Sequence, residues 1–257
     1  MPAPSLADRK TEFELCSKML NGEISERILL IEAPSKQGKS TLLAALAVAS
    51  RQLGAKHCAV IELKNCPPIR DVCRQIAQEM GRKACPLYSE ALAKPDAPVT
   101  VHASLAKARI GDRSEVMVQP VIHGSGAERV AEALLADLGD LNLPTLLIFD
   151  TYEKAGHDLQ QWMTGQLLPA VRRQSLLFAV VAGIEVPDVK DLGWGACARH
   201  HQLNVIESAD DWHSYAVARF PGIERSHLEV VLEGLSDPES IYNWIENKGR
   251  ALRQPAH

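Results

Sequence analysis

The sequence predicts an α/β fold, in which a parallel sheet flanked by helices is followed by a small C-terminal group of helices. Short apolar runs alternate with helical segments up to about residue 207, as they do in chains of βαβ units. The runs are apolar throughout, which is typical of strands buried on both faces. Three helical segments then follow with no strand pattern between them. We therefore divide the chain into an α/β core, residues 1–207, and a helical lid, residues 208–257.

The core elements follow one another in a regular order with one gap. We read them from the period of the apolar residues and from the glycines and prolines that interrupt it. The pattern predicts helices over 8–20, 39–52, 69–80, 127–138 and 157–174, and strands over 27–31, 57–63, 146–149, 175–182 and 203–206. Lid helices are expected over 210–220, 226–235 and 238–252. Between residues 82 and 124 the pattern weakens, and loose alternation over 99–121 favours a strand pair or an irregular insertion.

The composition narrows the classes of function. The 257 residues carry a formal net charge of −4, which argues against a general affinity for nucleic acid and leaves only a local basic patch open. No apolar run is long enough to span a bilayer, and no secretory signal is visible, so we expect no membrane partner. The six cysteines form no C-x-x-C pair, which is typical of reduced thiols in a cytoplasmic protein.

The loop after the first strand has the sequence of a phosphate-binding loop. Residues 33–40 read APSKQGKS and fit G-x-x-x-x-G-K-[ST] at every position except the first. Backbone N–H groups at the start of the following helix would face the phosphates, and the helix dipole favours their negative charge. Lys39 would meet the β and γ phosphates, Ser40 would bind Mg²⁺, and Thr41 would contact the α phosphate. The residues expected to bind ATP or ADP are Ala33, Pro34, Ser35, Lys36, Gln37, Gly38, Lys39, Ser40 and Thr41.

Two residues of this loop depart from the usual pattern. Ala33 replaces the first glycine, and if that position needs a positive φ, alanine costs about 1 kcal/mol. Lys36 stands where many such loops carry another glycine, and its charge adds positive potential near the phosphates. The alternative is a chance G-K-S on an ordinary strand–helix turn. The flanking strand and helix, and an acidic strand end downstream, argue against chance.

That acidic strand end is Asp150, after the apolar run TLLIF. The carboxyl ends of parallel strands meet at the edge where α/β folds bind ligands, so Asp150 can share Mg²⁺ with Ser40. Hydrolysis needs a further carboxylate to orient or deprotonate the attacking water. Thr151 follows directly, and Glu153 is the nearest acid. Glu153 is either this catalytic group, with Lys39 as its partner in catalysis, or a cap or ion-pair partner of Lys154 or a neighbouring helix.

Taken together, four stretches resemble the NTPase module of STAND proteins, a signal-transducing branch of the AAA+ and related P-loop ATPases. They are residues 8–20, residues 27–43, residues 146–155 with 162–173, and residues 176–187, and LLIFDTYEKA resembles a D-T-[YF]-E variant of Walker B. The resemblance implies five parallel strands in the order 5-1-4-3-2, with nucleotide between the core and the lid. GLSDPES at 234–240 resembles a turn in the lid, which would bring Pro238 to the base.

One departure from this family concerns hydrolysis. The strand after Walker B often ends in Gly-Arg, but here Gly183 is followed by Ile184. Arg9 is expected either to contact the nucleotide or to pair with Glu12. The pair His200-His201 is expected on a surface or in a loop.

Several functions stay open at this point. One is an ATPase switch with slow hydrolysis, for which the resemblance implies a role in bacterial signalling or defence. Another is a nucleotide-binding scaffold without turnover. In both, we expect a homo-oligomer or a separate effector or sensor protein as partner. A nucleic-acid motor lacks a binding motif, and no substrate pocket for a small-molecule kinase is identifiable.

Overall fold

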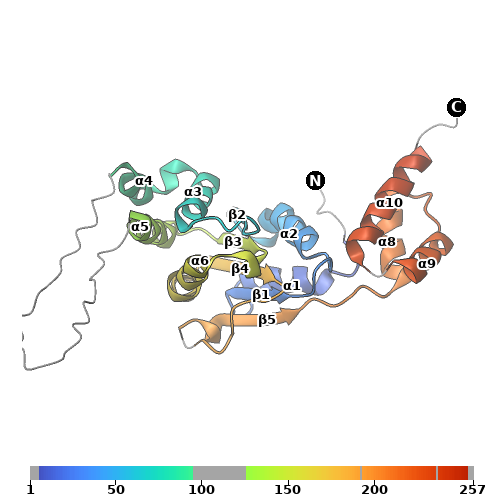
Figure 1. Ribbon diagram of the computed structural model, residues 1–257, viewed down its shortest axis with the longest axis horizontal. Coiled ribbons are helices and arrows are strands. Elements are labelled where there is room, and N and C mark those ends of the chain that lie inside the picture. Colours follow the sequence, from blue (N-terminus) through green and yellow to red (C-terminus); the bar gives the residue numbers. More distant parts are fainter. Residues whose placement is uncertain (1–5, 95–125, 192, 236, 254–257) are drawn as a thin grey trace, which may run out of the picture.

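The computed structural model describes residues 6–94, 126–191, 193–235 and 237–253 (Figure 1). The expected strand pair or insertion over 99–121 lies outside these residues. The strands are β1 (Ile28–Glu32), β2 (His57–Glu62), β3 (Thr145–Asp150), β4 (Leu177–Gly183) and β5 (Ala198–Gln202). The α-helices are α1 (Lys10–Leu20), α2 (Lys39–Leu53), α3 (Ile69–Met80), α4 (Pro86–Ala93), α5 (Gly126–Asp140), α6 (His157–Trp162), α7 (Leu168–Arg173), α8 (Ala209–Arg219), α9 (Arg225–Gly234) and α10 (Pro238–Arg253). Shorter helical turns are η1 (Arg82–Ala84), η2 (Tyr152–Lys154), the π-helical η3 (Met163–Leu167) and η4 (Gly195–Cys197).

The five strands form one parallel sheet in the order β2-β3-β4-β1-β5. Read from the other edge, this is the expected order 5-1-4-3-2. Because every strand runs the same way, all carboxyl ends lie along one edge of the sheet. The chain therefore has the α/β fold of a P-loop NTPase, with β1 between β4 and β5.

Each central strand is buried on both faces because its residues alternate between two apolar clusters. In β1, Leu30 belongs to the cluster under α3, α5 and α7, whereas Leu29 and Ile31 belong to the cluster under α1 and α2. β3 and β4 alternate in the same way, and all their residues are buried. This explains why the runs are apolar at every position and why their periodicity alone does not show which face is which.

Three parts of the core differ from the sequence-based prediction. The last strand is β5, not residues 203–206, which form no strand. β5 reads ARHHQ and lies at an edge with mostly exposed or half-buried residues, so it needs no apolar run. Helix α4 was not expected, because Pro86 was read as an interruption, although proline is well suited to the first turn of a helix. The expected helix over 157–174 contains the π-helical η3 between α6 and α7.

The C-terminal helices α8, α9 and α10 pack around an apolar cluster of their own at one end of the molecule (Figure 1). Trp212, Tyr215 and Tyr242 form its centre, with edge-on ring contacts and ring centroids 4.8 to 6.5 Å apart. Ser208 caps α8 by accepting a hydrogen bond from the Asp211 backbone N–H. Ile206 packs with these helices, and the boundary that we drew at residue 207 stays a prediction.

Packing in the lid predicts opposite effects for two glycine-to-alanine substitutions. A Cβ on Gly249 of α10 would collide with the ring of Phe220, whereas a Cβ on Gly234 of α9 meets no atom within 4 Å. Gly249→Ala should therefore lower the free energy of unfolding by about 1–3 kcal/mol, despite the better helix propensity of alanine. Gly234→Ala should leave it unchanged or raise it slightly. Urea denaturation followed by circular dichroism measures both, and equal effects of the two variants would contradict the packing described here.

Candidate functional site

The loop of residues 33–40 joins β1 to α2 at the carboxyl edge of the sheet. Gly38 has a φ of 80° and is the N-cap of α2, and no side chain caps this helix end. Its first backbone N–H groups thus lack intrahelical acceptors, which is the arrangement that binds anions at helix N-termini. Ala33 does not have a positive φ, so the conformational cost considered for it does not arise. Lys36 instead has a φ of 65° and carries that cost.

Ala33 lies deep in the core at the end of β1. It is 1% exposed, and its N–H donates to the Gly183 carbonyl oxygen over 3.1 Å. This backbone bond fixes the start of the phosphate loop to the end of β4. A glycine is therefore not required at position 33 in this structure.

The Lys39 ammonium lies between the loop and two carboxylates. Its Nζ donates to the carbonyl oxygens of Ala33 at 2.6 Å and Pro34 at 2.7 Å. Burial lowers the pKa of Lys39, and the charges of Glu153 and Asp150 oppose that shift. Lys39, Asp150 and Glu153 are thus close enough to interact electrostatically, which brings together three residues singled out from distant parts of the sequence.

A left-handed residue turns the chain after Asp150. Thr151 has φ 64° and ψ 47°, which is unusual for a β-branched side chain, and η2 follows at once. The turn directs Glu153 back to the end of β4, where its Oε2 accepts a hydrogen bond of 2.9 Å from the Ile184 backbone N–H. A Cβ on Gly183 would lie 2.8 Å from this oxygen, so the glycine leaves room for the carboxylate.

Glu153 was interpreted either as a catalytic carboxylate or as a cap or ion-pair partner of Lys154 or a neighbouring helix. Its described hydrogen bond is to the backbone of Ile184 rather than to Lys154 or a helix. One oxygen is thereby held in place, and a carboxylate has further acceptor positions for a water molecule. The catalytic role of Glu153 stays a prediction.

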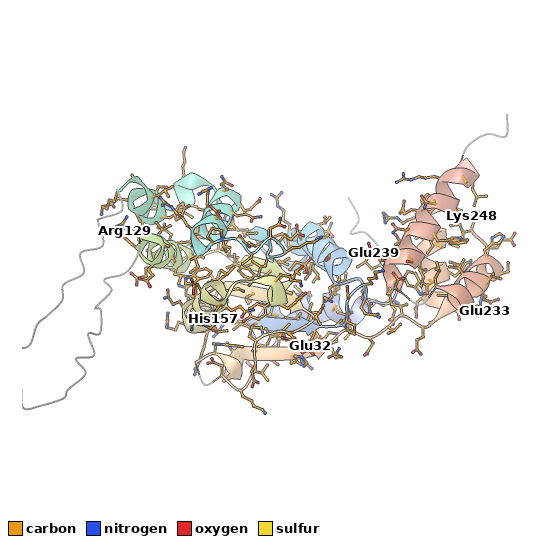
Figure 2. All side chains as sticks on the ribbon, viewed as in Figure 1. Glu32, Arg129, His157, Glu233, Glu239 and Lys248 are labelled. Atoms are coloured by element: carbon orange, nitrogen blue, oxygen red, sulfur yellow. The ribbon has the colours of Figure 1, made fainter. Side chains whose placement is uncertain are left out.

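The start of α10 packs against the phosphate loop. A Cβ on Gly38 would lie 3.7 Å from Pro238 Cβ and 4.0 Å from the Tyr242 ring. Figure 2 shows Glu239 at the end of α10 that faces α2. Hydrogen bonds from Ser240 hold the pKa of Asp237 below its ordinary value, and the charge of Lys36 contributes to this shift. The structure thus brings Pro238 to the loop, and its expected contact with a base stays a prediction.

Arg9 connects the phosphate loop to the segment after β5 and interacts electrostatically with Tyr242 of the lid. Its guanidinium donates to the backbone oxygens of Gln37 at 3.2 Å and Asn204 at 3.0 Å, and the residue is only 4% exposed. Burial lowers the pKa of Arg9, while the charges of Glu12 and Tyr242 oppose this. These contacts have no signature in the sequence, because their acceptors are backbone carbonyl oxygens.

His200 and His201 lie on the edge strand β5, where His200 is exposed, in keeping with the expected surface position, and His201 is half-buried. His200 pairs with Glu32 at the end of β1, and His201 pairs with Glu12 of α1, each at 2.9 Å (Glu32 is labelled in Figure 2). Burial alone would raise the pKa of Glu12, but the His201 hydrogen bond and the charge of Arg9 outweigh it and lower the pKa. These two hydrogen bonds connect β5 to β1 and α1.

Residues that could hold Mg²⁺ are Ser40, in the first turn of α2, and Asp150, which is 9% exposed at the end of β3. Among the described residues, no group of three or more histidine, cysteine or acidic side chains is placed to hold a metal ion. Two oxygen ligands suit Mg²⁺, which usually keeps several waters and takes further ligands from substrate phosphates. The residues present therefore fit a magnesium ion that arrives with a nucleotide.

No described helix is long and apolar enough to cross a membrane.

The chain was compared with known proteins. No protein-family model matches it, and no curated protein has significant sequence similarity to it. Among solved structures, the replication initiator DnaA bound to AMPPCP and single-stranded DNA is 11% identical, with a TM-score of 0.53, over 94% of this chain and 61% of DnaA. The Aeropyrum pernix ORC2 protein, in ADPNP and ADP complexes, is 15% identical with a TM-score of 0.52 over 90% of this chain and 58% of ORC2.

These similarities concern the fold. The chain spans about three fifths of the length of both of these proteins. Together with the sheet order, they support the parallel α/β fold described above. At this level of identity they carry no information about substrate or partner.

The backbone of Lys36 provides one test of this site. Lys36→Gly should raise the free energy of unfolding by about 0.5–1 kcal/mol, since glycine adopts a positive φ without strain but loses more entropy on folding. Lys36→Ala removes the same charge and keeps the strain, so it should be no more stable than the wild type. Urea denaturation compares the three proteins, and equal stability of the two variants would contradict the assignment of strain to Lys36.

The Glu12–His201 pair predicts a dependence of stability on pH. The pKa of Glu12 lies below its ordinary value of 4.5, so its stabilisation is fully present above about pH 4.5 and is lost as the pH falls through the folded-state pKa. Glu12→Gln should be less stable at pH 7 and should lose less stability between pH 5 and about pH 3. The control is Glu14→Gln, on the exposed side of the same helix. Parallel pH profiles of Glu12→Gln and the wild type would exclude this contribution.

Proposed function

We propose that this chain binds ATP with Mg²⁺ at residues 33–40 and hydrolyses it slowly, as a nucleotide-controlled switch. The observation that carries the proposal is the position of Lys39. Its ammonium lies on the loop beside two carboxylates, Asp150 at the end of β3 and Glu153 in η2. A cation and two acids at the N-terminus of an uncapped helix match the charges of a nucleoside triphosphate and its magnesium ion.

Each residue has a separate task in this proposal. Lys39 would exchange its two carbonyl acceptors for phosphate oxygens, which are stronger acceptors because they are charged. Ser40 and Asp150 would hold Mg²⁺, which neutralises charge on the phosphates when bound. Glu153 would accept a proton from, or orient, the attacking water, with one oxygen fixed by Ile184 N–H. The α2 N-terminus would stabilise the charge that remains.

Contacts of the lid and of Arg9 with the phosphate loop would transmit a change in that loop to other parts of the protein. Pro238 and Tyr242 of α10 lie against Gly38, and Arg9 bonds the carbonyl of Gln37. A change in the loop on nucleotide binding would therefore alter contacts with α10 directly. This supports nucleotide binding between core and lid, and it is in keeping with the resemblance to STAND modules, including the D-T-Y-E form of Walker B.

A specific observation favours a second candidate, a nucleotide-binding scaffold without turnover. The residue after Gly183 is Ile184, which is 43% exposed, where related modules often have an arginine that senses the γ phosphate. Without that charge, the transition state loses one source of stabilisation. Binding through Lys39 and the loop would be retained.

The proposal includes partners and location as well. We propose a cytoplasmic protein in bacterial signalling or defence that acts as a homo-oligomer or on a separate effector or sensor. The DnaA structure contains single-stranded DNA, but the net charge of −4 argues against the same role for this chain.

Two substitutions separate binding from hydrolysis. Lys39→Ala should abolish Mg²⁺-dependent ATP binding in calorimetry, because it removes the ammonium group that this proposal places against the β and γ phosphates. Glu153→Gln should keep binding and lower the rate of phosphate release by about 100-fold or more. Lys18→Ala, an exposed lysine of α1, is the matched control and should behave as the wild type.

The pattern of results decides between the candidates. Binding without phosphate release by the wild type would exclude the ATPase and leave the scaffold. No affinity of the wild type for ATP or ADP would exclude both.

A further inference from the structure

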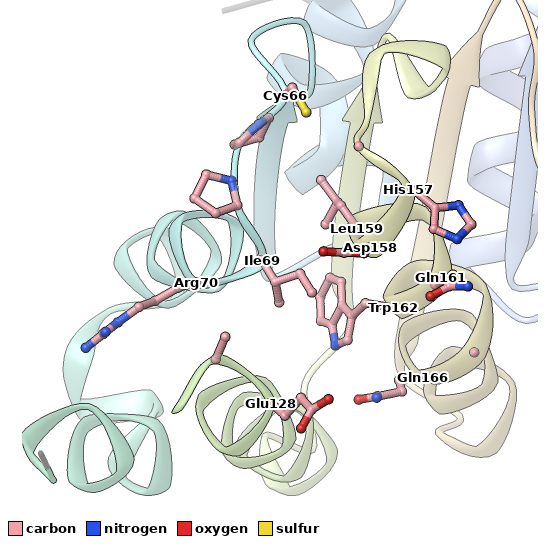
Figure 3. Close-up of a pocket in the computed structure, with 15 residues that line it drawn as sticks. Cys66, Ile69, Arg70, Glu128, His157, Asp158, Leu159, Gln161, Trp162 and Gln166 are labelled. Atoms are coloured by element: carbon pink, nitrogen blue, oxygen red, sulfur yellow. The ribbon is translucent and has the colours of Figure 1, made fainter. Parts of the chain in front are cut away.

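A cavity of about 780 Å³ lies outside the phosphate site, between the starts of α3 and α5 and the helix of α6 and η3 (Figure 3). Its lining comes from residues 66–70, 127–128, 156–159, 161–162 and 165–166. Its volume is in the range of pockets that hold small molecules, roughly 300–1,000 Å³. None of Lys39, Ser40, Asp150 and Glu153 lines it, so it is distinct from the candidate nucleotide site.

A buried donor without an acceptor points into this cavity. Trp162 is 3% exposed, and its indole Nε1 has no hydrogen-bond partner among the described residues. In Figure 3 the nitrogen is turned toward the space between Glu128 and Gln166. Buried N–H groups are nearly always paired in folded proteins, because an unpaired one loses its hydration without compensation. A ligand that brings an acceptor would remove this cost.

The helix that carries Trp162 is irregular at the same place. The π-helical η3 begins at Met163, directly after Trp162, and such turns occur frequently at functional sites. Gly165 lies in this turn and lines the cavity, and a Cβ built on it meets no atom within 4 Å. The π-turn thus leaves open space beside the unpaired indole N–H.

The lining defines the chemistry of a ligand. Pro67, Ile69 and Leu159 supply apolar surface, and the amides of Gln161 and Gln166 supply both donors and acceptors. Charged side chains of both signs are present, with Arg70 on one side and Asp158 and Glu128 on the other, so no single sign of ligand charge is favoured. A neutral molecule with an apolar body and a carbonyl group fits this environment.

One wall of the cavity is continuous with the turn that carries the candidate catalytic acid Glu153. Gly156 follows η2 closely, and a Cβ on it would lie 2.9 Å from the sulfur of Cys66, so the two loops touch. The loop of Cys66 begins at Leu63, whose N–H donates to the carbonyl oxygen of Asp150. A ligand that contacts both loops would therefore act on the segment from Asp150 to Glu153.

We propose that this cavity is an effector site for a neutral, carbonyl-bearing small molecule, whose carbonyl oxygen accepts a hydrogen bond from Trp162 Nε1 and whose binding alters nucleotide affinity. The ligand site stands on the cavity and Trp162 alone. The effect on nucleotide affinity rests on the proposed function.

Cys66 provides a direct test, because it lines the cavity and is the one exposed cysteine of the six. The full chain is equilibrated with the symmetrical disulfide of N-(2-sulfanylethyl)benzamide, or with that of 4-phenylbutane-1-thiol, which has the same length and no carbonyl group. The Cys66 thiol displaces one thiol from the disulfide and forms a mixed disulfide with the other. Intact mass and peptide mapping measure the fraction of Cys66 that is labelled under a fixed thiol buffer.

The benzamide should be captured about 3- to 10-fold more strongly than the hydrocarbon, as expected for one buried hydrogen bond. Trp162→Phe keeps an aromatic ring without the N–H and should remove this preference. Gly165→Leu fills the open space and should reduce capture of both probes. Gly234→Leu is the control, because Gly234 is also helical and open but does not line the cavity. Equal capture of the two probes by the wild type, or an unchanged preference in Trp162→Phe, would overturn the ligand site.

The effector role has its own readout. Calorimetry compares the ATP affinity of benzamide-labelled and unlabelled protein, and a change of about 5-fold or more, in either direction, is expected for coupled sites. Unchanged affinity after selective capture would overturn the effector role. If unlabelled protein binds no nucleotide, the proposed function fails and the effector role with it, while the capture data still decide the ligand site.

Discussion

The candidate site depends on the burial of the three central strands on both faces of the sheet. Because Leu29 and Ile31 face one layer of helices and Leu30 faces the other, β1 cannot shift by one residue without exposing apolar side chains or creating voids. The same holds for β3 and β4. Parallel strands fixed in this register end together, and their carboxyl ends deliver the phosphate loop, Asp150 and Gly183 to one edge. The apolar core thereby sets the positions of the polar groups.

The polar contacts at this edge then add constraints that the core does not supply. Arg9 bonds the phosphate loop and the segment after β5, while His201 and Glu12 join β5 to α1. Of these three side chains, Arg9 also interacts electrostatically with the lid residue Tyr242, whose pKa is raised by burial to about 12. Polar contacts of Arg9 and Glu12 thus connect the start of α1 with the phosphate loop, with β5 and the segment after it, and with the lid.

The sequence was sufficient to predict the strands β1 to β4, the phosphate loop and the acidic strand end, because each has a local physical signature. Apolar runs mark strands buried on both faces, and Gly38-Lys39-Ser40 marks a loop between strand and helix. β5 has no such signature, since an edge strand with exposed histidines resembles a loop. The backbone acceptors of Arg9 and the left-handed conformation of Thr151 follow from tertiary packing, so no local pattern could predict them.

Three of the five described non-glycine residues with a positive φ lie at the candidate site or the cavity, and Asp8 and Asn142 are the other two. Lys36, Cys66 and Thr151 all have positive φ values, at 65°, 49° and 64°. They occupy the phosphate loop, the wall of the cavity and the turn after Asp150. Residues in such conformations persist only where the surrounding contacts require them. Thr151 directs Glu153 to Ile184, and Cys66 touches the loop at Gly156. Contacts made by a bound molecule at either loop would therefore act on backbone that is already away from its preferred conformation.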